Sequence, residues 1–154
     1  KFELILQKCT EIGVSKFVPI QTKRSLLKVS DIKPERLERF QKIITEAAEQ
    51  SERGLLPLIA KPLKFEEAII ELPTQGLTLC AWEDEKKHSL SDILEKEVKE
   101  KNISIFIGPE GGFEKEEIIF AKKHDVVTVS LGPRILRTET AAIVTSTLAL
   151  ANAT

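Results

Sequence analysis

A glycine-rich segment in the second half of the chain has the composition of a ligand-binding loop. It reads IGPEGGF, covers residues 107–113 and follows an apolar run. Gly108 permits a turn directly after a strand, and Gly111 and Gly112 leave main-chain N–H groups unobstructed, so a flat or polar ligand can approach the backbone closely. The segment lacks the lysine of a P-loop and the spacing of a dinucleotide fingerprint, and Glu110 would repel a phosphate. A glycine turn without a ligand is the structural alternative.

A second unusual segment, LGPRILRTETA, covers residues 131–141. Ile135 and Leu136 are apolar where a loop is expected to be polar, which predicts that this loop covers something. Thr138 or Thr140 can cap the helix that follows. That helix is apolar nearly all round, which indicates burial on several sides, either inside the fold or at a subunit interface.

Short apolar runs alternate with helical patterns along the rest of the chain. The expected strands cover residues 16–20, 56–62, 76–82, 103–107 and 126–131. The expected helices run from Leu4 to Ile12, from Pro34 to Arg53, over 64–72, from a cap at Ser89 or Ser91 to about Lys101, over 115–123, and onward from Arg137. This alternation predicts an α/β domain with a mostly parallel sheet and helices on both faces. Ligands of such sheets bind beyond the carboxyl ends of the strands, where both unusual segments begin.

Composition places the chain among ordinary globular domains. It has 154 residues, of which 42% are hydrophobic and 31% charged, and a formal net charge of −1. This charge argues against the strongly basic class of nucleic-acid binders. Cys9 and Cys80 have no cysteine or histidine partner at metal-ligand spacing, which predicts two core thiols and no metal site. The absence of a membrane-spanning pattern and of a signal peptide predicts a cytoplasmic protein, and the absence of methionine predicts a processed or truncated chain.

Positive charge is concentrated in the first part of the chain. Residues 1–64 hold 13 Lys and Arg against 8 acids, a balance of +5, while the remainder holds 10 against 16, a balance of −6. Lys23, Arg24 and Lys28 lie close together, and Arg53 follows the long helix pattern. These residues are candidates for phosphate contacts, and a solvated charged face is the structural alternative.

The motifs LQKCTEIGV, EAAEQSER, IGPEGGF and LGPRILRTETA, in this order, resemble the RsmE-type small-subunit rRNA (uridine-N3) methyltransferases of the SPOUT class. The resemblance extends from Gln7 to Ala141. It implies an α/β domain over residues 1–154 with a C-terminal trefoil knot, S-adenosylmethionine (SAM) as the methyl donor, and a homodimer. The PUA-like N-terminal domain of the family is expected to be absent from this chain.

The resemblance implies a cofactor site built from main-chain groups and apolar walls. The residues expected to contact SAM are Ala81, Trp82, Ile107, Gly108, Pro109, Glu110, Gly111, Gly112, Leu131, Gly132, Ile135, Leu136 and Arg137. For Trp82, a place in the core is the alternative to a stacking role.

The implied reaction transfers a methyl group to N3 of a uracil, which must lose its proton. Arg137 is the expected cation that stabilises charge on the uracil carbonyl oxygens. Glu139 or Glu110 is the candidate base. Glu139 has the alternative of favouring the helix N-terminus, and Glu110 that of orienting the glycine loop.

The expected macromolecular partner is small-subunit rRNA or the assembled small subunit. Lys23, Arg24, Gln50 and Arg53 are the candidate RNA contacts, and for Arg53 the alternative is a bond to helix-terminal carbonyls. Two other functions stay open at this point. One is a SPOUT enzyme acting on another RNA position such as a ribose hydroxyl, and the other is a nucleotide- or RNA-binding module without catalysis.

Overall fold

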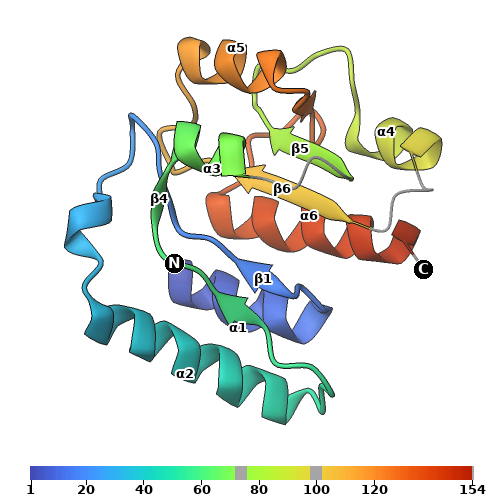
Figure 1. Ribbon diagram of the computed structural model, residues 1–154. Coiled ribbons are helices and arrows are strands. Elements are labelled where there is room, and N and C mark those ends of the chain that lie inside the picture. Colours follow the sequence, from blue (N-terminus) through green and yellow to red (C-terminus); the bar gives the residue numbers. More distant parts are fainter. Residues whose placement is uncertain (72–75, 98–101, 154) are drawn as a thin grey trace.

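The computed structural model describes residues 1–71, 76–97 and 102–153. A three-stranded parallel sheet lies at its centre, with β5 (Leu77–Ala81) between β6 (Ile103–Ile107) and β7 (Val127–Val129) (Figure 1). The order matches the expected α/β class, since each parallel neighbour is reached through a helix.

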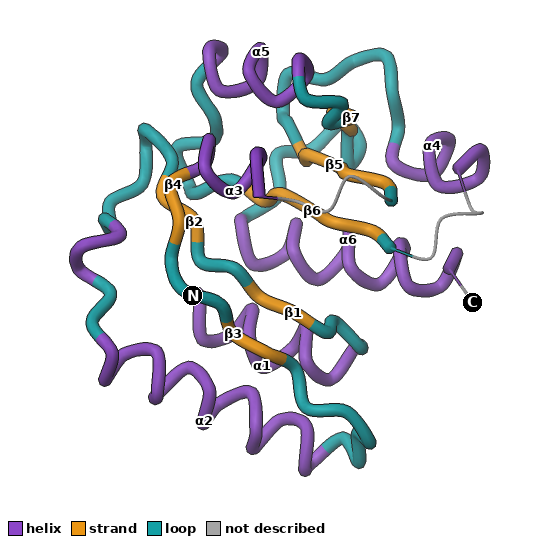
Figure 2. Tube along the Cα trace, in the orientation of Figure 1, coloured by secondary structure: helices purple, strands orange, loops and turns teal. Residues whose placement is uncertain are grey.

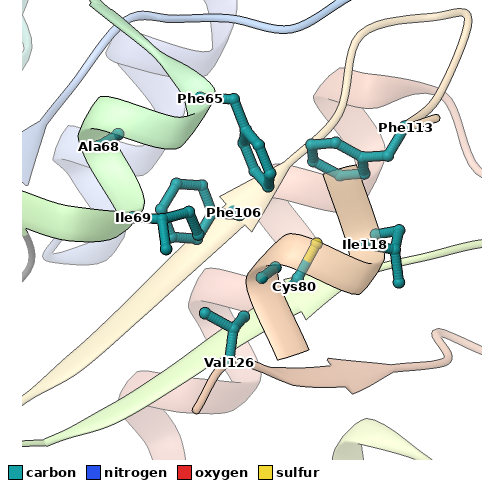
Figure 3. Packing of buried hydrophobic residues seen from close by; sticks show 9 residues of the cluster. Phe65, Ala68, Ile69, Cys80, Phe106, Phe113, Ile118 and Val126 are labelled. Atoms are coloured by element: carbon teal, nitrogen blue, oxygen red, sulfur yellow. The ribbon is translucent and has the colours of Figure 1, made fainter. Parts of the chain in front are cut away.

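Helices cover both faces of this sheet. On one face, α3 (Phe65–Glu71) and α5 (Lys115–Lys123) pack against Cys80 and Phe106, and Figure 3 shows this cluster with Phe65 and Phe113 beside it. On the other face, α4 (Leu90–Glu97) and α6 (Thr138–Ala153) pack against Leu79 and its neighbours. The alternation of side chains along β5 divides the core into these two clusters.

The first part of the chain forms a second unit of structure beside α6. The helices α1 (Phe2–Ile12) and α2 (Pro34–Gln50) pack on each other, and α1 also packs on α6 (Figure 2). Two short parallel pairs run beside them. They are β1 (Lys16–Phe17) with β3 (Leu58–Ile59), and β2 (Ile20–Gln21) with β4 (Leu63–Lys64). A 3-10 turn, η1 (Val29–Asp31), precedes α2.

The sequence predicted single strands over 16–20 and 56–62. The first is divided in the structure, whereas the second is shortened to β3, and β4 begins after it and was not predicted. Pro19 separates β1 from β2, and Pro62 precedes β4. Proline has no N–H for a sheet ladder, so pairing stops and restarts on its far side. The parallel pairs therefore form separate small sheets and not one continuous sheet.

One helix end differs from its expected position. The prediction that the long helix reaches Arg53 is wrong, because α2 ends at Gln50 and Glu52 adopts a left-handed conformation with φ of 56°. Of the two candidate caps for α4, Ser89 is the one used, since its Oγ accepts the N–H of Asp92 at 3.1 Å. The expected extension of this helix to Lys101, and of the 64–72 helix to Leu72, lies outside the described residues.

The apolar character of α6 is explained within the subunit. Its buried residues are Ala141, Ala142, Thr145 and Ala149. The helix contacts the sheet cluster on one side and α1 on the other, where the Cys9 thiol lies 3.9 Å from the Ser146 hydroxyl. Of the two expected reasons for its composition, burial inside the fold therefore applies.

β7 has hydrogen-bonded neighbours on both of its edges. The carbonyl of Val129 accepts the N–H of Trp82, at the end of β5. Ser130 instead donates to the carbonyl of His88 at 2.8 Å and accepts the N–H of Leu90 at 3.0 Å. Consecutive residues of a strand direct their hydrogen bonds to opposite sides, so the end of β7 lies between β5 and residues 88–90.

Both cysteines are core thiols, as predicted. Cys9 and Cys80 are buried, and burial raises the pKa of Cys80 to about 12. Among the helices that the structure describes, none is long and apolar enough to cross a bilayer.

Gly76 makes a tight approach at the start of β5, which gives a stability prediction. Its φ is 126°, and an added Cβ would overlap the carbonyl oxygen of Asn102 and lie 2.9 Å from the Asn102 Cβ. Gly76→Ala should therefore lower the free energy of unfolding by more than about 2 kcal/mol, measured by denaturant unfolding. Gly54→Ala is the control, because an added Cβ there meets nothing within 4 Å. Equal stability of the two variants would contradict this strand geometry.

Candidate active site

Three loops leave the central sheet at one edge. They cover residues 82–88 after β5, 108–114 after β6 and 130–137 after β7. Because the strands are parallel, their carboxyl ends lie at the same edge, where the two unusual segments of the sequence begin. The predicted cofactor residues are therefore gathered in one region.

Close contacts at two glycines shape the loop after β6. A Cβ added to Gly108 would lie 3.0 Å from the ring of Phe113, which is buried in the aromatic cluster. Gly112 has a φ of 70°, its N–H bonds the Pro109 carbonyl at 2.9 Å, and an added Cβ would lie 3.1 Å from Oε1 of Glu83. The loop is a tight turn in which the glycines leave the main chain accessible. A ligand that binds close to the backbone requires such access.

A side-chain hydrogen bond joins this loop to the start of α6. The hydroxyl of Thr138 donates to the carbonyl oxygen of Gly108 at 3.1 Å. Thr138 begins α6, whose first turn is set by a bond from the N–H of Ala141 to the carbonyl of Arg137 at 2.8 Å. The two predicted cofactor loops are thus held at a fixed distance from each other.

The three candidate catalytic residues share one charged neighbour, the side chain of Lys1. Its Nζ lies 2.8 Å from Oε1 of Glu110. That hydrogen bond raises the pKa of Lys1, with Glu139 adding to the increase and Arg137 opposing it. The Lys1 ammonium therefore lies within electrostatic range of all three residues. Sequence reasoning assigned no role to Lys1, because its partner Glu110 is 109 positions away in the chain.

Glu110 and Glu139 have different environments. The hydrogen bond from Lys1 lowers the pKa of Glu110, which makes this exposed carboxylate a weaker base. Glu139 has a buried Oε2 for which the described residues provide no hydrogen-bond partner. A buried carboxylate oxygen requires a donor, so Glu139 is the better placed of the two to accept one from a ligand.

The end of β5 forms a further wall of this region. Ala81 and Trp82 are half-buried, and the Trp82 indole packs against the cluster of α3 and α5. Lys122 Nζ lies 5.3 Å from the centre of that ring. Trp82 therefore packs at the edge of the core, with part of its side chain exposed.

The loop after β7 has one buried and one exposed apolar end. Leu131 packs against the cluster of α4 and α6, and Leu136 is half-buried. Gly132 turns the chain with a φ of 108°. Ile135 is 83% exposed, so in the single chain it covers nothing. An isoleucine held in this position suits a surface that a ligand or a second chain covers.

Glu85 organises the loop after β5 and was missed in the sequence, where it is one of three acids in the polar run WEDEKKH. It is 6% exposed and accepts the hydroxyl of Thr128 together with the N–H groups of Lys87 at 2.8 Å and His88 at 3.3 Å. Burial raises its pKa, but these hydrogen bonds and the charge of Lys122 outweigh burial and lower the pKa to about 2. Glu85 thereby fixes the loop over β7.

This shift predicts a pH-dependent contribution to stability. The pKa of Glu85 is lower in the folded state than the ordinary value of 4.5, so its contribution is complete above pH 4.5 and is lost as the pH falls towards about 2. At neutral pH, Glu85→Gln should cost about 3 kcal/mol of unfolding free energy, and this difference should shrink towards zero near pH 2. Denaturant unfolding at several pH values measures it. Asp84→Asn, an exposed neighbour, is the control and should show no such difference.

The four candidate RNA contacts lie in different settings. Lys23 is exposed, and its main-chain N–H donates to Oε1 of Glu117 at 2.8 Å. Arg24 donates to the Gly111 carbonyl at 2.7 Å and to Glu114 at 2.8 Å, so it braces the glycine loop. These two residues therefore lie beside the cofactor loops.

Arg53 and Gln50 lie at the far end of α2. The Arg53 guanidinium donates to the carbonyls of Thr10, Gly13 and Val14 at 2.7 to 3.2 Å, which caps the C-terminus of α1. The helix-terminal alternative therefore describes Arg53, although the helix is α1 and not its own. Gln50 is exposed and lines a groove of about 350 Å³ between α1 and α2, together with the acids Glu3, Glu11 and Glu46. Such a lining does not favour a phosphate.

A metal centre finds no support in the described part of the chain, which holds no group of three or more His, Cys, Asp or Glu side chains able to bind an ion.

Comparison with known families decides the classification. A family model described as an RNA methyltransferase domain matches residues 1–150. The chain belongs to this family.

Relatives of this RNA methyltransferase domain carry one shared name. The ribosomal RNA small subunit methyltransferase E of Bacillus subtilis (strain 168) is 38% identical over 146 residues, which is 92% of this chain and 57% of that protein. The protein of the same name from Synechocystis sp. (strain ATCC 27184 / PCC 6803 / Kazusa) is 42% identical and matches 91% of this chain and 46% of its own length. The RsmE resemblance is thereby confirmed, and the chain spans about half the length of these relatives.

Solved structures share the fold of this RNA methyltransferase domain. A methyltransferase from Legionella pneumophila in complex with SAM has a TM-score of 0.86 at 33% identity, covering 97% of this chain and 61% of that one. A ribosomal RNA small subunit methyltransferase E from Neisseria gonorrhoeae, bound to SAM, has a TM-score of 0.84 at 31% identity, covering 94% of this chain and 58% of that one. The expected α/β fold is confirmed by these neighbours.

Proposed function

We propose that the protein containing this RNA methyltransferase domain methylates N3 of a uridine in small-subunit rRNA with SAM as the methyl donor. The observation that carries the proposal is the match of nine tenths of the chain to rRNA small subunit methyltransferases E. The gathering of Arg137, Glu139 and the glycine loop at one edge of the sheet supports the same chemistry.

The residues at this edge suit SAM better than a nucleotide phosphate. The turn from Gly108 to Gly112 offers bare main chain, and Ile135 and Leu136 supply apolar surface. The buried Oε2 of Glu139 has no hydrogen-bond donor among the described residues. Both an amino group of SAM and a uracil N3–H can provide one. These residues would hold the adenosyl group between the loops after β6 and β7, with Ala81 as a further wall.

SAM supplies an electrophilic methyl group bonded to a positively charged sulfur. The chain has to orient the uracil in line with that bond, and correct alignment removes much of the entropic part of the barrier. N3 must lose a proton as the new N–C bond forms, and Glu139 accepts it directly or through water. Arg137 stabilises the negative charge on the uracil carbonyl oxygens. The hydrogen bond from Lys1 keeps Glu110 ionised and makes it the weaker base, so Glu110 does not accept the proton.

The proposal extends to the assembly. We infer a homodimer in which the exposed Ile135 is covered, and a C-terminal knot. The position of β7 between β5 and residues 88–90, both earlier in the chain, supports the knot. Action on rRNA or on the small subunit would place the protein in the cytoplasm.

Two measurements on the full-length protein test the function. Calorimetric titration with SAM should show saturable binding. If no SAM binds, the protein is a non-catalytic binding module and the proposed function is wrong. Mass spectrometry of nucleosides from treated small-subunit rRNA should show a uridine methylated on the base. A methyl group on the ribose would instead identify a different RNA methyltransferase and overturn the N3 assignment.

A further inference from the structure

The loop between β2 and η1 presents exposed apolar side chains to solvent. Leu26 is 93% exposed, more than any other large hydrophobic residue described, and Leu27 beside it is 37% exposed. A single exposed leucine is not unusual by itself. The surroundings of Leu26 distinguish it.

The loop that carries Leu26 is braced. Ser25 Oγ accepts the N–H of Thr22 at 3.0 Å, and the Ser25 N–H bonds the Thr22 carbonyl at 3.2 Å. On the far side, Oε1 of Gln21 accepts the N–H of Val29 at 2.7 Å, and Asp31 accepts the N–H of Lys28 at 2.9 Å. Leu26 is therefore presented from a fixed frame.

The frame rests on the cofactor loop. Arg24 Nη1 donates to the Gly111 carbonyl at 2.7 Å, and its Nε lies 2.8 Å from Glu114. The Lys23 N–H bonds Glu117 at the start of α5. Figure 1 shows the 22–28 loop beside the loop that follows β6. Leu26 thus lies on a loop that contacts the glycine-rich loop of the proposed cofactor site.

Cations flank the leucine on both sides of the loop. Lys23 and Lys28 are exposed, and Arg24 is partly exposed beyond its bonds to the glycine loop. An apolar tip between cations complements single-stranded or locally opened RNA, which offers base faces bordered by phosphates. Removing a uridine from its stack leaves an apolar gap that a leucine can fill.

We propose that Leu26 inserts into the RNA beside the target uridine and occupies the stack that the extruded base leaves, with Lys23 and Lys28 on the flanking phosphates. This inference rests on the proposed function for the identity of the target, but its main test reads RNA contact without methyl transfer.

The direct test places an indole at the loop tip of the full-length protein. Leu26→Trp should lose a large part of its added fluorescence when small-subunit rRNA is bound, because indole stacked on bases is quenched. Leu55→Trp is the matched control, since Leu55 is 78% exposed on the loop after α2. Equal responses of the two variants to RNA would overturn the proposal.

Affinity measurements separate stacking from charge. Leu26→Ala should weaken rRNA binding about tenfold without changing the salt dependence, whereas Lys28→Ala should lower the slope of log K against log salt by about one. Leu55→Ala should change neither quantity. A Leu26→Ala protein with unchanged rRNA affinity would contradict insertion.

The remaining outcomes distinguish this inference from the proposed function. If Leu26→Ala dissociates a dimer while RNA affinity per dimer is kept, Leu26 belongs to a subunit interface and the inference fails. If bound RNA quenches the indole of Leu26→Trp but the unsubstituted protein transfers no methyl group from SAM, the proposed function fails and the inference stands.

Discussion

Replacing Arg137 by alanine in the full-length protein is expected to abolish most methylation while SAM still binds. The Lys1 ammonium lies within electrostatic range of both this guanidinium and Glu139, in the region where negative charge would spread over the uracil carbonyl oxygens. Removing one preorganised donor of this kind costs on the order of a hundred- to a thousandfold in turnover. The measurement is the single-turnover rate of methyl transfer to rRNA, with a calorimetric titration of SAM on the same preparation.

Arg134 provides the control for this substitution. It lies three positions earlier in the same loop, is exposed and carries the same charge. Arg134→Ala should therefore keep a turnover close to that of the unsubstituted protein. Unchanged turnover in Arg137→Ala would remove this residue from the catalytic group, and an equal loss in both variants would point to a general electrostatic effect of the loop.

The second large effect concerns Gly108. A Cβ at this position would lie 3.0 Å from Cε2 and 3.2 Å from Cδ2 of Phe113, whose ring is packed against Phe65 with 5.2 Å between centroids. The ring has little room to move, so Gly108→Ala should displace the loop and disturb the bond between Gly108 and Thr138. Overpacking of about 2 kcal/mol corresponds to a roughly thirtyfold weaker affinity for SAM, measured by calorimetry.

A second substitution tests whether this contact is the cause. Gly108→Ala combined with Phe113→Leu removes the ring that the methyl group meets, so the double variant should recover part of the SAM affinity. Phe113→Leu alone sets the baseline for the thermodynamic cycle. If the double variant loses as much SAM-binding free energy as the two single variants together, the contact is not responsible.

The parts of the fold that could be predicted are those with a local physical signal. The boundaries of β6 and α5 follow from an apolar run, a glycine turn and a helical period within a few residues. The alternation of such runs is enough to predict the parallel class and the edge that bears the site. The division of the strand at Pro19 and the separate strand β4 after Pro62 were missed because two-residue strands are too short to show a period.

The parts of the site that could not be predicted depend on contacts between distant residues. Glu85 is one carboxylate among several until Thr128 and Lys122 come within reach of it. Arg53 looks like an RNA contact in the sequence, but α2 ends at Gln50 and the left-handed turn at Glu52 allows the guanidinium to reach the carbonyls of α1. The periodicity of the sequence does not indicate such distant partners. The glycines of residues 108–112, in contrast, indicate a turn by residue type alone.

The position of β7 has a consequence for how the protein is made. Residues 127–130 leave the ribosome after both of their neighbours, β5 and residues 88–90, yet they take an inner place between them. Until they arrive, the nascent chain has two strand edges with unsatisfied amide and carbonyl groups, which attract other extended chains. Completion of the sheet must therefore wait until residue 130 has been made, and ribosomes that stall before residue 127 would release aggregation-prone products.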